Sequence, residues 1–157
     1  MRKRLNIEEV KTFIEAQGPN TKIYIGADSE RYLKDDKWYA DYTLAIVVHI
    51  DGRHGCKIFG EVQTEFDYDF KASKPSTRLM NEVYKVAELY QKLMDVVGER
   101  EVQIHLDINP DPHHNSNIVI QQAIGYIRGV CNVIPLIKPQ AFAASYAADR
   151  LKELLIA

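Results

Sequence analysis

Two acidic residues follow apolar runs that have the pattern of β-strands. Asp28 comes directly after KIYIGA, a run typical of a strand that is buried on both faces. Asp107 closes EVQIHLD, in which apolar and polar residues alternate. If the two runs are neighbouring parallel strands, their carboxyl ends frame one crevice, the usual ligand site of an open α/β sheet. We therefore expect Asp28 and Asp107 to project into one cleft.

Two further acids occupy predicted helices. Glu82 lies three and four residues from Leu79 and Val86, on the inward stripe of a long helical segment. A carboxylate beside a core stripe costs free energy unless it is paired or bound to metal. Asp149 stands among small residues of the Ala-rich segment 139–157, which would let that helix pack close to the sheet. Both side chains are therefore expected to reach the same cleft.

Basic and polar residues near these acids are candidates for substrate contacts. Lys138 follows an apolar run, so its ammonium would emerge near the acids and hold a phosphate or the attacking water. Lys71, Lys74 and Arg78 precede or begin the helix of Glu82 and could grip phosphates. A solvated helix face is the competing interpretation. The remaining predicted substrate-binding residues are Ser29, Asn109, His113 and His114.

The elements that would position these residues follow a simple order. Helical spacing predicts helices over residues 6–16, 79–97, 118–128 and from 139 nearly to the end. Strand patterns cover residues 22–28, 38–50, 57–66, 101–107 and 133–137. Three antiparallel strands followed by βαβα units favour an α/β fold with a five-stranded mixed sheet, helices on both faces and an extra N-terminal helix.

Length and composition limit the class of protein. The chain has 157 residues, 46% of them hydrophobic, which suits one domain over residues 1–157 with one core. Two cysteines without CxxC spacing, no signal-like run and no membrane-length apolar segment predict a soluble cytoplasmic protein. The net charge of -2 means that nucleic acid would have to bind through a local basic patch. An edge strand of the front hairpin could pair in a homodimer, although nothing in the sequence demands it.

The order of acids and elements resembles the ribonuclease H-like superfamily. Its members place acids on the first strand, the first long helix, the fourth strand and the last helix, in the order of Asp28, Glu82, Asp107 and Asp149. The runs IGADSE, HLDINP and IKPQAFAASYAADR are most similar to the YkuK-type family. The resemblance covers nearly the whole chain after the first helix. It implies a metal-dependent nuclease acting on RNA, an RNA/DNA hybrid or structured, branched DNA.

The chemistry of such a site follows from its charge. Carboxylates forced together repel one another, and Mg²⁺ or Mn²⁺, which prefer oxygen ligands, relieve that repulsion. Two ions roughly 4 Å apart can activate water and stabilise both oxygens of an in-line displacement. We expect Asp28 and Asp107 to be the central ligands of two ions, with Glu82 and Asp149 each holding one side.

Simpler roles exist for three of the four acids. Asp28 could accept backbone hydrogen bonds in a turn. Glu82 could form an ion pair, and Asp149 could be a charge on a helix surface. The candidate partners of Glu82 in that case are Arg78, Lys85 and Lys138.

Other functions remain open at this stage. Asp28-Ser29-Glu30 matches the DxE of proofreading-type 3′-5′ exonucleases, but Ser145 stands where that class has His or Tyr. A zinc site with His105 lacks the helical His pair of a strong motif, so His113 or His114 would assist proton transfer or product release instead. A non-catalytic nucleic-acid- or protein-binding module, or an enzyme acting on small phosphorylated molecules, are the remaining alternatives.

Overall fold

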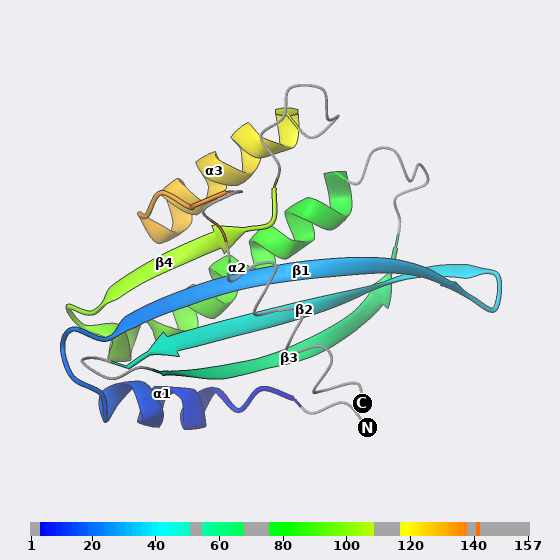
Figure 1. Ribbon diagram of the computed structural model, residues 1–157. Coiled ribbons are helices and arrows are strands. Elements are labelled where there is room, and N and C mark those ends of the chain that lie inside the picture. The colour runs from blue at the N-terminus through cyan, green and yellow to red at the C-terminus, as the bar shows by residue number, and fades with distance from the viewer. Residues whose placement is uncertain (1–3, 51–54, 68–75, 109–116, 138–140, 142–157) are drawn as a thin grey trace.

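The computed structural model describes residues 4–50, 55–67, 76–108, 117–137 and 141. In this part of the chain, four strands form one mixed sheet in the order β3-β2-β1-β4, accompanied by three helices (Figure 1). The strands are β1 (Lys22–Lys34), β2 (Lys37–His49), β3 (Cys56–Phe66) and β4 (Glu101–Leu106). The helices are α1 (Ile7–Glu15), α2 (Ser76–Val97) and α3 (Asn117–Cys131).

Strands β1, β2 and β3 form the predicted antiparallel meander, but β1 is longer than expected. The prediction that the first strand ends at Asp28 is wrong, because Ser29 to Lys34 continue to pair with β2. Asp35 and Asp36 alone connect the two strands, and both have positive φ, 51° and 62°. A two-residue turn of this kind matches the twist of a hairpin. The polar residues after Ala27 therefore form one half of a long β-ribbon.

Strand β4 lies beside β1 and runs parallel to it, as the sequence predicts. The pairing begins at Lys22 opposite Glu101 and ends at Ala27 opposite Leu106. Asp28 is thus the next residue of β1 and Asp107 the first residue after β4, two strands whose backbones lie about 4.8 Å apart where they pair. β4 ends one residue earlier than expected, and Asp107 follows it directly.

The helices begin and end close to the predicted residues. The side chain of Asn6 caps α1 by accepting hydrogen bonds from the backbone N–H groups of Glu8 and Glu9. α2 ends before Gly98, whose φ of +59° is the left-handed conformation that terminates helices. α3 continues three residues past the expected end at Arg128, and Asn132 adopts the left-handed conformation after it.

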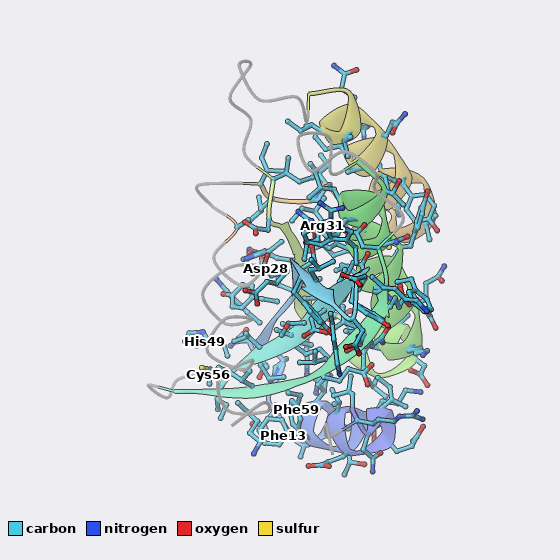
Figure 2. All side chains as sticks on the ribbon, turned by 90° about the vertical axis from the view of Figure 1, so that its right-hand side faces the viewer. Phe13, Asp28, Arg31, His49, Cys56 and Phe59 are labelled. Carbon is cyan, nitrogen blue, oxygen red and sulfur yellow. The ribbon has the colours of Figure 1, made fainter. Side chains whose placement is uncertain are left out.

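A single hydrophobic cluster joins the three helices to one face of the sheet. Alternate strand residues point into it, including Ile25, Leu44 and Ile104, and Leu93 of α2 is fully buried among them. Figure 2 shows the helices on the same side of the sheet, with Phe13 of α1 beside Phe59 of β3; their ring centroids lie 5.5 Å apart. Helices on the opposite face remain a prediction, because the last predicted helix lies outside the described residues.

The predicted fifth strand over residues 133–137 is not a strand in the structure. Leu136 makes one isolated parallel bridge with His105, through hydrogen bonds of 2.8 Å to the backbone of Ile104 and Leu106. Pro135 has no N–H to donate to a ladder, which weakens this short run as a strand. Within the described residues the sheet therefore has four strands.

Candidate functional site

The candidate site lies where β4 ends beside β1. Residues on either side of Asp28 alternate between the two faces of the sheet, since the pairing of β1 with β2 runs without a bulge from Lys22 to Lys34. Ala27 and Ser29 therefore face the helices, whereas Asp28 faces the opposite side. Ala27 and Leu106 are the last pair of β1 with β4, and Asp107 follows Leu106 directly. Beyond Ala27, the described part of the chain has no strand on the β4 side of β1, so side chains from both faces can approach this edge.

Glu82 reaches this edge from α2. It is 5% exposed, and its Oε2 accepts a hydrogen bond of 2.9 Å from the hydroxyl of Ser29. The Ser29 backbone N–H in turn donates to Oδ1 of Asp28, also at 2.9 Å. Ser29 thus connects the two predicted acids through its side chain and its backbone, and it fixes the position of Glu82 relative to β1.

The three described acids share one electrostatic environment. Burial raises the pKa of Glu82 well above its usual value, and the charge of Asp28 raises it further. The hydrogen bond from Ser29 opposes this rise, Asp107 adds to it, and Arg78 lowers the pKa slightly. The charges of Asp28 and Asp107 thus both act on the Glu82 carboxyl, and the shared site of the three acids stays a prediction. Asp149 lies outside the described residues.

The strand face beside the acids is polar and buried. His105 is fully buried and pairs with Gly26 across the two strands. Its Nε2 lies 3.0 Å from Oε1 of Gln103, and its ring is tilted against that of Tyr24 with centroids 5.2 Å apart. Burial lowers the pKa of His105 to about 4, so the imidazole is neutral at neutral pH.

The structure describes two of the residues that the sequence offers as ion-pair partners of Glu82. Arg78 lies four residues before Glu82 on α2, and its charge acts on the Glu82 carboxyl. Lys85 instead donates to Oε1 of Gln63 at 2.6 Å and to Oε1 of Glu65 at 2.8 Å. The ion pair of Glu82 with Lys85, considered from the sequence, is therefore not present.

Seven predicted site residues lie outside the described part of the chain. They are Lys71, Lys74, Asn109, His113, His114, Lys138 and Asp149. Among the residues that are described, the side chains of His, Cys, Asp and Glu form no group of three or more that could hold a metal ion. The donor chemistry of Asp28, Glu82 and Asp107 nevertheless fits a hard divalent cation, because all three offer carboxylate oxygens and together concentrate negative charge.

The comparison with family models decides the family. The model described as Ribonuclease H-like matches residues 6–153. The chain belongs to the ribonuclease H-like family. This confirms the resemblance drawn from the order of acids and elements. No curated protein and no solved structure gives a significant match to this ribonuclease H-like chain.

From the sequence, Ser29 is expected to contact substrate in the ribonuclease H-like site, and that role stays a prediction. The structure adds an unpredicted contact, in which the Ser29 hydroxyl donates to Glu82, 53 residues away. Strand alternation carries a signal for this contact, since it places Ser29 on the helix-facing side. The extension of β1 beyond Asp28 had to be recognised first.

None of the described helices combines the length and the apolar character that crossing a membrane requires.

Proposed function

We propose that this ribonuclease H-like chain is a divalent-metal-dependent nuclease that hydrolyses phosphodiester bonds in RNA, an RNA/DNA hybrid or structured DNA. The observation that carries the proposal is the contact of the buried Glu82 carboxylate with β1, where Ser29 links it to Asp28 through two hydrogen bonds of 2.9 Å. Burial and the charges of Asp28 and Asp107 raise the pKa of Glu82, and such perturbed carboxyl groups are typical of functional sites. Family membership supports a role on nucleic acid at the level of the fold.

The cofactor in this proposal is Mg²⁺ or Mn²⁺, with two ions expected. Asp28, Glu82 and Asp107 would hold the metal, with Asp149 as the predicted fourth ligand. When bound, the metal would supply positive charge for activating water and for stabilising the oxygens of an in-line displacement. The same charge would offset the repulsion among the carboxylates.

The described residues around the acids have supporting roles in this proposal. The Ser29 hydroxyl orients Glu82, and the Ser29 backbone N–H holds Asp28. His105 is neutral and fully buried, so it packs against Tyr24 rather than carrying a proton at neutral pH. Lys138, predicted to hold a phosphate or the attacking water, completes the proposed set.

Replacing Asp28 or Asp107 by Asn should abolish Mg²⁺-dependent cleavage, because each change removes a negatively charged oxygen donor. The assay incubates labelled RNA, RNA/DNA hybrid and branched DNA with each purified protein and resolves the products by length. Asp95→Asn is the matched control, since Asp95 is an exposed acid of α2 that bonds Lys11 at 2.9 Å. Unchanged cleavage by Asp28→Asn would refute the assignment, and product lengths would separate endonuclease from 3′-5′ exonuclease action.

Metal binding separates the enzyme from a non-catalytic binding module. Calorimetric titration with Mn²⁺ should show two saturable sites in the wild-type chain and weakened binding in Glu82→Gln. No heat of binding at millimolar Mn²⁺ would contradict the nuclease and favour a module that keeps the fold.

A cytoplasmic location is part of the proposal. Both cysteines are free thiols, with Cys56 exposed and Cys131 buried. Free thiols suit a reducing compartment.

A further inference from the structure

Three aromatic side chains form a row across the antiparallel strands. Tyr32 of β1 is paired with Tyr39 of β2, and Tyr39 is paired with Phe66 of β3. The rings of Tyr32 and Tyr39 are stacked with centroids 5.8 Å apart, and those of Tyr39 and Phe66 with centroids 5.0 Å apart. The interplanar angles are only 20° and 25°, so the three rings, called here the ring row, stand nearly parallel.

The ring row lies on the same sheet face as Asp28. Asp28 and Tyr32 are separated by four residues of a strand that pairs without a bulge, so their side chains point the same way. Four residues of strand span about 13 Å. A polymer held at Asp28 and extending along β1 would therefore meet the ring row within a short distance.

A buried carboxylate holds the ring row in place. Asp41 is 7% exposed, and its Oδ1 accepts hydrogen bonds from Tyr32 Oη at 3.3 Å and from Thr64 Oγ1 at 2.7 Å. Leaving a buried carboxylate without hydrogen-bond donors costs free energy, and this cost favours the contact between Asp41 and the Tyr32 hydroxyl. The position of Tyr32 is therefore set before any ligand binds, which reduces the entropy lost on binding.

The ring row is accessible at the surface. Phe66 is 47% exposed, and Tyr32 and Tyr39 are partly exposed. In the described residues, β1 pairs only with β2 beyond Ala27, so Tyr32 stands at the edge of the sheet next to the acids. Arg31 and Trp38, with the guanidinium carbon 4.0 Å from the ring centroid, occupy the opposite face of the same ribbon.

We propose that the ring row stacks unpaired bases of the nucleic-acid strand whose phosphodiester bond is held at Asp28. This inference rests on the proposed function and narrows its substrate to strands with a single-stranded segment. Parallel aromatic rings are the usual platforms for single strands, because every base has a π-face. Close to the rings, Lys34 and Lys37 are balanced by Asp35 and Asp36, so stacking rather than phosphate attraction supplies the binding energy.

The experiment measures binding of fluorescent oligouridylate and oligothymidylate by anisotropy in Mg²⁺, using Asp28→Asn protein so that the strand stays intact. Adding Tyr39→Leu or Phe66→Leu should weaken binding at least about fivefold, because each removes a flat ring but keeps apolar bulk. The dependence of binding affinity on salt concentration should be the same for these variants as for the parent protein. Tyr32→Phe should bind slightly more weakly than its parent, because it keeps the ring but loses the hydrogen bond to Asp41, whereas Tyr32→Ala should bind more weakly still.

Tyr84→Leu is the matched control, since Tyr84 is 46% exposed and packs against Tyr126 on the helices. Thermal unfolding of every variant tests whether the fold is retained. Equal affinity of the Tyr39→Leu and Tyr84→Leu proteins, or tighter binding of blunt duplex than of single strand, would overturn the ring row as a base platform.

The outcomes also separate this inference from the proposed function. Normal cleavage by Tyr39→Leu with unchanged binding refutes the platform and leaves the nuclease intact. Ring-dependent binding together with normal cleavage by Asp28→Asn supports the platform and refutes the assigned acids. If no strand binds at all and the variants differ only in self-association measured by sedimentation, the row is a protein contact and the inference is wrong.

Discussion

Glu82 is the residue at which burial, charge and hydrogen bonding act against one another. Burial and the neighbouring carboxylates favour its protonated form, whereas the Ser29 hydroxyl and Arg78 favour its ionised form. In the metal-free protein burial is the largest of these effects, so the pKa of Glu82 lies well above its usual value. A bound divalent cation would lower it, because positive charge beside the carboxyl stabilises the ionised form. Proton release and metal binding are therefore expected to be coupled at this residue.

The raised pKa of Glu82 predicts that the metal-free protein loses stability as pH rises. Between the pKa of the unfolded chain and the higher pKa of the folded state, the folded state binds more protons, so the free energy of unfolding falls with pH. Glu82→Gln should flatten this dependence and stabilise the metal-free protein at neutral pH. Urea unfolding at pH 5 to 8 in EDTA measures it. Glu88→Gln is the control, because Glu88 is exposed and pairs with Lys92 at 3.1 Å.

His105 gives a pH effect of the opposite sign. Its folded-state pKa of about 4 lies below the usual 6.5, so the unfolded chain binds more protons between these values. The contribution of neutral His105 to stability is therefore complete above about pH 6.5 and is lost as pH falls toward 4. Nuclear magnetic resonance titration of the imidazole should show it neutral down to about pH 4. A midpoint near 6.5 would contradict this buried, neutral state.

At the scale of elements, the long ribbon of β1 and β2 shows what the sequence could and could not predict. The parallel pairing of β1 with β4 and the inward stripe of α2 follow from hydrophobic periodicity. That Asp28, Asp107 and Glu82 form one site stays a prediction, which the charges acting on Glu82 support. The continuation of β1 past Asp28 does not follow from periodicity, because the run SERYLK has no strong alternation of apolar and polar residues. Its strand conformation comes from pairing with β2.

The tertiary contacts of the site lie further beyond sequence patterns. The hydrogen bond from Ser29 to Glu82 joins residues 53 apart, and no local spacing specifies it. Residues 133–137 show the opposite case, in which a segment predicted to be a strand does not form one. Its apolar residues fit a strand by composition, but only Leu136 forms a bridge. In each case the partner element, rather than the segment itself, determines the outcome.

The backbone conformation of the turn between β1 and β2 can be tested by substitution. Asp35 and Asp36 both have positive φ, a conformation that costs residues with a Cβ some free energy and costs Gly little. Asp36→Gly should therefore stabilise the protein by about 0.5–1 kcal/mol, while Asp36→Val should destabilise it. Urea unfolding followed by circular dichroism measures both. Stabilisation by Val would show that the turn does not have this geometry.

At the scale of the molecule, one core holds the edge at which the acids are proposed to meet. Residues of α1, α2 and α3 join those of the strands in a single cluster on one sheet face. Glu82 belongs to the same helix as the buried residues Val83, Val86 and Leu93. The position of α2 against β1 therefore sets the distance between Glu82 and Asp28, and core packing and site geometry depend on the same contacts.

Neighbouring residues of α2 allow this dependence to be tested. Leu93 is fully buried, whereas Met94 is 49% exposed. Leu93→Ala should destabilise the protein by about 2–5 kcal/mol, because it removes buried methyl groups and leaves a cavity. Met94→Ala should change the free energy of unfolding by less than about 0.5 kcal/mol. Because the cavity lets α2 shift against β1, Leu93→Ala should also weaken Mn²⁺ binding under conditions where the protein is still folded. Equal Mn²⁺ affinity of the two folded variants would show that the acids are held independently of the core, by Ser29 and the strand ends alone.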